Sequence, residues 1–187
     1  MMDSYYDWEF IIVDRFSYLS LWDFKQWFPE RWDVIVFKPW VNADKEYFIK
    51  RVIGIPGDEL KIEDGKVFLR VQWQNDFVEL DEPYLSDANS WATFVAGESS
   101  EKKYKVPDGQ YFVVWDHRNA STDSRTCFYS CSTGKSEFIK KEDIVWKVWL
   151  DLGYFNFRTF KFEHPDLPKK TYPRFFSSPD SHDYNAD

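Results

Sequence analysis

Apolar residues in this chain fall in short runs rich in Val, Ile, Phe and Tyr. Polar turn residues interrupt these runs about every eight to twelve positions, which is typical of an all-β domain. Apolar residues spaced three and four positions apart, the mark of a helix, are scarce. The expected strands are residues 10–14, 34–38, 47–53, 59–63, 66–71, 110–114 and 144–150.

The pair Asp64-Gly65 is the clearest turn signal, because a two-residue Asp-Gly connection matches the twist of a tight β-hairpin. Residues 72–105 are polar and irregular, so we expect a small lobe inserted into a β core made of residues 1–71 and 106–155. Pro, Ser, Asp and Lys dominate the last part of the chain, and we expect residues 156–187 to form a loosely ordered extension.

Length and charge narrow the class of protein. The 187 residues suffice for one domain with a real core, or for a core with a small lobe. The net charge is -8, so no nucleic-acid partner is expected. There is no run of about 18 uncharged apolar residues and no secretory leader, so we expect the chain as printed to be soluble.

Two cysteines, Cys127 and Cys131, stand close together in the sequence. This spacing fits two free thiols as well as a small disulfide loop, because spacing alone does not fix the bond geometry. None of the histidines, His117, His164 and His182, has a paired spacing with the cysteines. We therefore expect no zinc site, and no metal or cofactor of any kind.

One lysine, Lys50, lies in an expected strand among apolar residues and precedes a Pro-Gly-Asp turn. Burial lowers the pKa of a lysine and turns its amine into a usable general base. The strand by itself favours a simpler interpretation, a lysine that points into water, because alternate residues of a strand face opposite sides.

The last expected strand but one runs into a loop filled with hydroxyls and charges. In this loop either Asp123 with Arg125 or Asp116 with Arg118 is placed to form an ion pair, and Ser121 is placed to hold a catalytic amine by a hydrogen bond. Taken alone, the loop is more simply interpreted as a solvated polar turn.

Together the two stretches resemble the bacterial type I signal peptidases, also called leader peptidases. Residues 48–58, Phe-Ile-Lys-Arg-Val-Ile-Gly-Ile-Pro-Gly-Asp, resemble the lysine box of that family. Residues 115–125 resemble its Gly-Asp-Asn-Arg-x-x-Ser-x-Asp-Ser-Arg box, residues 31–37 its Arg-Gly-Asp strand, and residues 82–85 its Glu-x-Tyr-Leu segment. The resemblance covers roughly residues 2–150. Four matches in the family's order are hard to obtain by chance.

The resemblance implies a mostly β fold of antiparallel sheets, forming a partial barrel with a small inserted lobe. It also implies a serine endopeptidase that removes signal peptides from exported preproteins at Ala-x-Ala sites. In this family pattern Lys50 is the general base, Ser121 orients it, and Asp123 with Arg125 is the ion pair behind the site. The remaining implied roles are support of the site by Asp116 and Arg118, and substrate binding by Ile49 and Met2.

The family's nucleophilic serine belongs to a Ser-Met-x-Pro-Thr motif, which the start of this chain fits from its methionine onward. The serine would immediately precede Met1, and a membrane anchor would lie further upstream. We therefore expect the chain as printed to lack both and to be inactive. Ser4 falls at the motif's threonine and is not expected to be the nucleophile. The resemblance places the enzyme at the cell membrane, with its catalytic domain on the extracytoplasmic side.

The chain has ten Trp and only seven Gly, whereas average usage predicts about thirteen Gly. Several Trp precede an acidic residue between strand-like runs, where turns often need the positive φ that Gly adopts easily. The family pattern has Gly at Trp8, Trp32, Trp115 and Trp146, but not at Trp149. Some bacterial lineages read the codon UGA as glycine, and we hypothesise such codons here, the alternative being genuine Trp. The hypothesis extends to Trp22, Trp27, Trp40 and Trp91.

Other functions remain open. A conjugative-transfer pilin peptidase shares the Ser-Lys chemistry and differs in its substrate. A self-cleaving repressor of related fold needs a helical DNA-binding segment, and the sequence contains no pattern for one. A catalytically dead β-domain that serves as a binding or scaffold module is favoured only if no serine codon precedes Met1.

Overall fold

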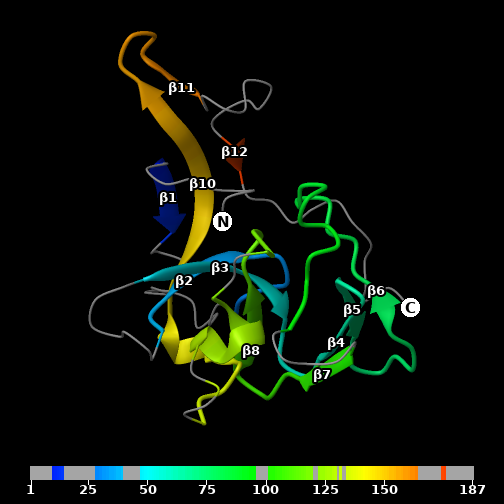
Figure 1. Ribbon diagram of the computed structural model, residues 1–187. Helices are drawn as coiled ribbons and strands as arrows, with labels where there is room; N and C mark the ends of the chain where they lie inside the picture. Colours follow the sequence, from blue (N-terminus) through cyan, green and yellow to red (C-terminus); the bar gives the residue numbers. More distant parts are fainter. Residues whose placement is uncertain are drawn as a thin grey trace.

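The computed structural model describes residues 10–14, 28–39, 47–95, 101–119, 122–129, 131, 134–163 and 174–175. In this part of the chain the strands form one eight-stranded and one four-stranded sheet, drawn in Figure 1. Each strand pair is antiparallel. The predicted fold class, mostly β with antiparallel sheets, is therefore confirmed.

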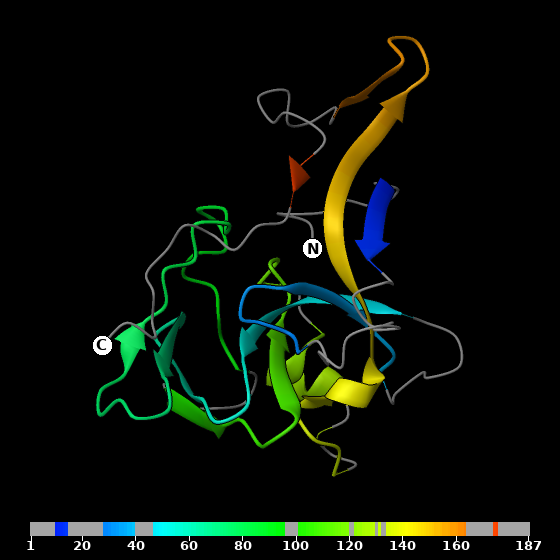
Figure 2. The same cartoon turned by 180° about the vertical axis from the view of Figure 1, so that it is seen from behind.

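The larger sheet brings distant parts of the sequence together in the order β1-β10-β2-β3-β8-β9. Strands β11 and β12 also pair with β10, which runs out of the body past β1 to the hairpin that it forms with β11 (Figures 1 and 2). In this order β3 lies between β2 and β8, so the strand that carries Lys50 neighbours the strand that leads into the 115–125 loop. The bounds are β1 (Phe10–Asp14), β2 (Val34–Phe37), β3 (Phe48–Gly54), β8 (Gln110–Val114), β9 (Ile139–Lys140), β10 (Ile144–Asn156), β11 (Lys161–Glu163) and β12 (Arg174–Phe175).

The smaller sheet has the order β6-β5-β4-β7, with β4 (Glu59–Glu63), β5 (Lys66–Arg70), β6 (Val78–Glu79) and β7 (Glu101–Lys105). Strands β4 and β5 form the predicted hairpin, and its turn residues Asp64 and Gly65 both have positive φ, 48° and 79°. Positive φ at both positions is what a tight two-residue turn of this hand requires. The Asp-Gly signal in the sequence was therefore sufficient for this connection.

Each expected strand is present, with ends shifted by a residue or so except in β10, which continues to Asn156. The segment expected to be irregular contains β7, which sequence reasoning missed because its Glu-Lys-Lys-Tyr-Lys pattern shows one apolar position, the buried Tyr104. The smaller sheet takes strands from both sides of residue 72. The division into a core, an inserted lobe at 72–105 and an extension at 156–187 stays a prediction.

A shared core joins the two sheets. Leu60 and Leu69 of the smaller sheet pack in one buried cluster with Ile53 and Phe112 of the larger sheet. At the end of β3 the backbone passes so close to this cluster that a Cβ on Gly54 would lie 2.7 Å from the Leu60 side chain. Glycine is thus required where the chain crosses from one sheet to the other.

After β8 the chain forms a short 3-10 segment, η2 (Ser124–Tyr129), and a second one, η4 (Lys141–Asp143), precedes β10. Cys127 of η2 is joined to Cys131 by a disulfide bond, which decides between the two alternatives that the spacing left open. Phe128, next to the disulfide, is buried against Phe37. The segment that follows the polar loop is therefore fixed to the core.

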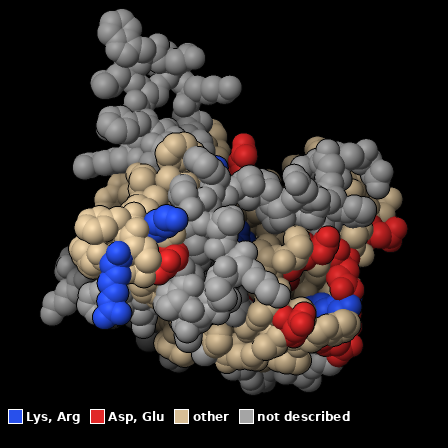
Figure 3. Space-filling view, turned by 90° about the horizontal axis from the view of Figure 1, so that it is seen from above, with Lys and Arg blue, Asp and Glu red and all other residues tan. Residues whose placement is uncertain are grey.

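No helix among the described residues is long and apolar enough to cross a membrane. Seen from above, the described surface carries Asp and Glu together with Lys and Arg, so charges of both signs share this face (Figure 3).

Backbone angles test the tryptophan hypothesis at some positions. Trp32 has a positive φ of 76°, as expected for a position that suits glycine. Trp73, which sequence reasoning did not single out, also has a positive φ, of 80°. Trp115 and Trp146 do not have positive φ, so the turn argument is wrong for Trp115 and gives no reason for Gly at Trp146. The remaining hypothesised positions, apart from Trp91, lie outside the described residues: Trp8, Trp22, Trp27 and Trp40.

Replacing Trp73 by Gly is expected to stabilise the fold. The indole is 92% exposed, so little packing is lost, and a bulky residue in the left-handed region costs about 1–2 kcal/mol. We expect the free energy of unfolding, measured by urea denaturation, to rise by about 1 kcal/mol in Trp73→Gly.

The matched control is Trp149→Gly, which removes a half-exposed indole from the middle of β10. Here Gly is expected to lower the free energy of unfolding, because glycine weakens a strand interior. Equal effects in the two variants would contradict the left-handed backbone at Trp73.

Candidate active site

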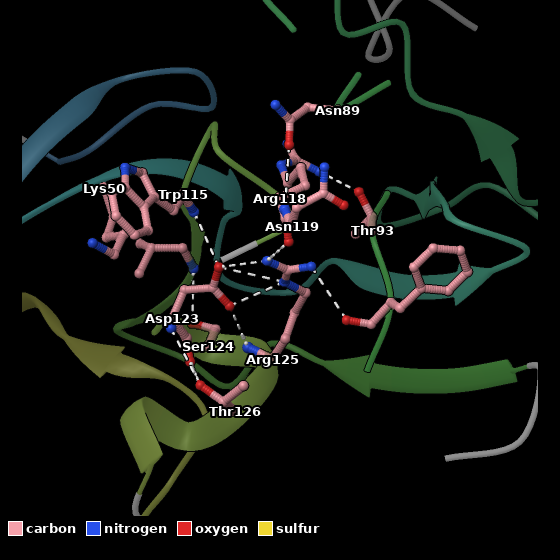
Figure 4. Close-up of polar contacts among 12 residues, drawn as sticks. Lys50, Asn89, Thr93, Trp115, Arg118, Asn119, Asp123, Ser124, Arg125 and Thr126 are labelled. Atoms are coloured by element: carbon pink, nitrogen blue, oxygen red, sulfur yellow. Dashed lines mark hydrogen bonds and ion pairs between the residues drawn. The ribbon is translucent and has the colours of Figure 1, made fainter. Parts of the chain in front are cut away.

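Strand β3 places Lys50 opposite Ile35 of β2 and holds it inside the protein. Lys50 is 7% exposed, and its Nζ donates a hydrogen bond of 3.0 Å to the carbonyl of Ile49. The amine lies 5.2 Å from the ring centre of Phe48 and 4.7 Å from that of Trp115, beside which Figure 4 shows it. The simpler interpretation of an exposed lysine is therefore wrong.

Burial lowers the pKa of Lys50 from 10.5 to about 8, because the ammonium has lost its water. The negative charges of Asp123 and Asp116 act in the opposite direction and raise the pKa, but burial outweighs them. The amine therefore loses its proton far more readily than an exposed lysine does.

Asp123 and Arg125 form the ion pair that the sequence predicted. Arg125 Nη2 lies 3.0 Å from Asp123 Oδ2, and both side chains are almost fully buried. The same carboxylate accepts hydrogen bonds from the backbone N–H groups of Trp115, at 3.1 Å, and Arg125, at 3.0 Å. Asp123 thus ties the start of the loop to its end (Figure 4).

The alternative pairing of Asp116 with Arg118 is not formed. Asp116 instead binds Arg51, the neighbour of Lys50, through two hydrogen bonds of 3.0 and 2.8 Å. Arg118 turns the other way and forms an ion pair with Glu82. The physical reason is that the neighbouring strand offers Asp116 a two-point contact with the guanidinium of Arg51, and Glu82 offers Arg118 a two-point contact with its carboxylate.

Two expected site residues, Ser121 and Met2, lie outside the described residues. Ile49 is half-buried and packs against the cluster of Val34, Val36 and Val148. The structure thus brings Lys50, Asp116, Asp123 and Arg125 to one place, with Ile49 beside them. The role of each residue stays a proposal.

Sequence reasoning missed Arg51 and Glu82 as site residues, although both lie in the motifs that carry the resemblance. Arg51 had one usable signal, a second basic residue in a strand that is otherwise apolar, which must find a partner if buried. Glu82 had none, because its partner Arg118 is far away in the sequence.

Two further ion pairs connect the segment before β2 to its neighbours. Arg31 Nη1 donates 2.7 and 2.8 Å hydrogen bonds to Asp58 Oδ2 and to the carbonyl of Ile53. Asp33 pairs with Lys147 at 2.6 Å, and burial raises the pKa of Asp33 although this hydrogen bond lowers it. The turn just before β2 is thereby fixed to both β3 and β10.

Among the described residues, no group of three or more His, Cys, Asp or Glu side chains is arranged to hold a metal ion. What the site does offer is an amine with a lowered pKa, held rigidly between two rings and a carbonyl. Such an amine can accept a proton from an alcohol brought next to it.

Comparison with known proteins gives a consistent result. Residues 1–150 match the family described as signal peptidase, peptidase S26. Signal peptidase I V of Bacillus subtilis is 35% identical over 121 residues, which cover 62% of this chain and 63% of that protein. Signal peptidase I of Bacillus caldolyticus is 33% identical over 140 residues, covering 71% of this chain and 65% of that protein.

Probable signal peptidase I-2 of Synechocystis is 35% identical over 119 residues, which are 61% of this chain and 45% of that protein. The chain thus spans about half to two thirds of the length of these relatives. A crystal structure of a signal peptidase I from Enterococcus faecalis V583 aligns with 65% of this chain and 97% of that chain, at 25% identity and a TM-score of 0.45.

The family match includes β1, β2, β3 and β8, the loop with both buried aspartates, and the buried lysine. The chain belongs to the signal peptidase family, peptidase S26.

Proposed function

We propose that this chain is the catalytic domain of a type I signal peptidase, a serine endopeptidase that removes signal peptides from exported preproteins. The single observation that carries the proposal is the buried amine of Lys50, with a pKa of about 8. A lysine of ordinary pKa is neutral about once in a thousand molecules at pH 7.5, whereas a pKa of 8 leaves about a quarter neutral.

In the proposed reaction a serine hydroxyl attacks the carbonyl carbon of the scissile peptide bond. Neutral Lys50 takes the proton of the hydroxyl as the oxygen–carbon bond forms, and returns it to the leaving amine as the peptide bond breaks. Water then hydrolyses the acyl-enzyme ester with the same amine as base. Ser121 is proposed to orient Lys50 by a hydrogen bond. The family pattern puts the nucleophile at the position before Met1.

The proposed substrate is the cleavage region of a signal peptide, with small side chains such as those of Ala-x-Ala sites. The apolar surface around Ile49 supports pockets for small residues, with Met2 proposed to line them as well. Because exported preproteins emerge at the membrane, the proposed place of action is the extracytoplasmic face of the cell membrane. No specific observation favours a pilin peptidase or a scaffold module.

Trp115 covers the proposed base in this chain. Its ring lies over the Lys50 amine, and its indole N–H is buried without a hydrogen-bond partner among the described residues. Glycine at this position, as the family pattern has it, would leave open the space that the indole fills beside Lys50. The chain with Trp115 is therefore expected to be a poorer enzyme than one with Gly.

The first prediction for the site concerns activity. A chain that carries the proposed serine before Met1 is expected to cleave a preprotein, with kcat rising with pH and levelling off above about 8 because Lys50 must be neutral. Replacing Lys50 by Ala is expected to lower kcat by roughly a thousandfold or more. The assay follows cleavage by gel electrophoresis.

The controls for this experiment are the chain as printed and a version with Ala at the serine position. Both are expected to be inactive. Full activity in the Lys50→Ala version would refute the role of the amine.

The second prediction concerns stability. Lys50 has a lower pKa in the folded chain, about 8, than its ordinary 10.5, so between these values the unfolded chain binds more protons and the free energy of unfolding rises with pH. Below this window the buried ammonium costs on the order of 3 kcal/mol. Lys50→Met is therefore expected to be more stable than the parent at neutral pH, with the difference lost above the window.

Urea denaturation across this pH range measures the effect. Lys103→Met serves as the control, because Lys103 is 60% exposed. If the free energies of unfolding of Lys50→Met and the parent differ by the same amount at every pH, the Lys50 amine remains hydrated in the folded chain.

The third prediction tests the cover over the base. In Trp115→Gly, water gains access to the amine, so the pKa of Lys50 is expected to rise above 8 toward 10.5. Carbon-13 NMR of the lysine ε-methylene measures it directly. Trp149→Ala, which alters a half-exposed Trp elsewhere, should leave the pKa in place. An unchanged pKa in both variants would mean that other groups exclude the water.

A further inference from the structure

Glu82, which lies between the smaller sheet and the loop of the site in the chain, binds that loop directly. It binds the guanidinium of Arg118 with both oxygens, Oε1 on Nη2 and Oε2 on Nη1, the latter at 3.3 Å. The Arg118 side chain is fully buried and that of Glu82 is 9% exposed. A two-point contact between buried charges fixes both the distance and the orientation of its partners.

Two neighbours of Glu82 complete the contact. Thr93 Oγ1 accepts a 2.7 Å hydrogen bond from Arg118, and the Tyr84 hydroxyl accepts another, at 3.3 Å, while it donates to Glu82. The ring of Tyr84 in turn lies 4.0 Å below the guanidinium of Arg51. Tyr84 therefore couples the Glu82–Arg118 pair to the arginine that binds Asp116.

The same segment holds the loop at two further points, drawn in part in Figure 4. Asn89 Oδ1 accepts a 3.2 Å hydrogen bond from the backbone N–H of Asn119. The carbonyl of Phe94 accepts a 3.2 Å hydrogen bond from Arg125. The segment thus binds the loop at Arg118, Asn119 and Arg125.

Arg118 depends on Glu82 for its charge balance. Burial alone lowers the pKa of Arg118, but the charge of Glu82 and its hydrogen bond to Arg118 outweigh burial and help to raise it above its ordinary value. Without the carboxylate a guanidinium would be left buried and uncompensated. Such a group moves toward water, and the loop would move with it.

In the sequence Arg118 lies between Asp116 and Asp123, whose negative charges both raise the pKa of Lys50. We propose that Glu82 is a positioning residue for the peptidase reaction, which acts through Arg118 to hold the loop of Asp116 and Asp123 in register with Lys50. The inference deepens the proposed function and rests on it. Glu82 touches neither the base nor the substrate.

The test uses the chain that carries the proposed serine before Met1. In Glu82→Gln the side chain keeps its shape and loses its charge. We expect kcat to fall roughly 10- to 100-fold, because small displacements of a catalytic group cost that much. KM is expected to change by less than about threefold, since the substrate contacts stay. The pH at which kcat levels off is expected to shift as Asp116 and Asp123 move relative to Lys50.

The matched control is Glu79→Gln, the same substitution in β6. Glu79 is 48% exposed and pairs with Lys66 at 2.6 Å, away from the loop. Its kcat and pH profile are expected to equal those of the parent. If Glu82→Gln also leaves both unchanged, the proposal is overturned.

The double variant Glu82→Gln/Arg118→Gln shows whether this ion pair only stabilises the fold or also positions the loop. It leaves no unpaired charge, so the fold is expected to regain stability while kcat stays low. Recovery of kcat together with stability would show that the pair only supports the fold, and would overturn the proposal.

If Glu82→Gln unfolds, a second variant that removes only one hydrogen bond to Arg118 tests the proposal instead. Thr93→Val removes the hydroxyl bound to Arg118 and leaves its charge paired, and we expect kcat to fall by roughly three- to tenfold in a chain that is folded but has a lower melting temperature. An unchanged kcat here, with Glu82→Gln unfolded, would also overturn the proposal. A parent without activity, or a fully active Lys50→Ala, would instead refute the proposed function.

Discussion

The structure depends on one constraint, that a charge removed from water must meet an opposite charge with good geometry. Leaving one partner of a buried pair alone costs about 3–5 kcal/mol, a large share of the stability of a domain. The chain satisfies this constraint by joining its motifs to one another. The buried pairs are Arg31 with Asp58, Arg51 with Asp116, Arg118 with Glu82, and Arg125 with Asp123.

Lys50 differs from these arginines in a way that matters for chemistry. In the described part of the chain no carboxylate lies within ion-pair distance of its amine, and its hydrogen-bond acceptor is a neutral carbonyl. The aspartates near it are already bound, Asp116 by Arg51 and Asp123 by Arg125. Burial therefore lowers the pKa of Lys50. The arginines that bind these aspartates therefore also keep Lys50 without a direct ion-pair partner, and this allows its amine to act as a base.

The tryptophans show how backbone and side chain give separate information. Trp73 is exposed and left-handed, so glycine would fit it better on both counts. Trp32 is also left-handed, but its ring is buried and packs on Tyr84, so the molecule as it stands uses this side chain. Trp115 has an ordinary backbone, and its importance lies in the ring that covers Lys50. A single codon hypothesis therefore has a different physical consequence at each position.

The sequence by itself determined the longer strands and the Asp64-Gly65 hairpin, because alternation and turn chemistry are local properties of the chain. The motifs of the site followed from their resemblance to those of a known family. The sequence also placed Asp123 beside Arg125, which are two residues apart. It did not determine the side to which Lys50 points, the disulfide, or the partners of Asp116 and Arg118. Those were decided by the tertiary structure, because burial and ion pairing depend on which distant segments the sheets bring within a few ångströms of each other.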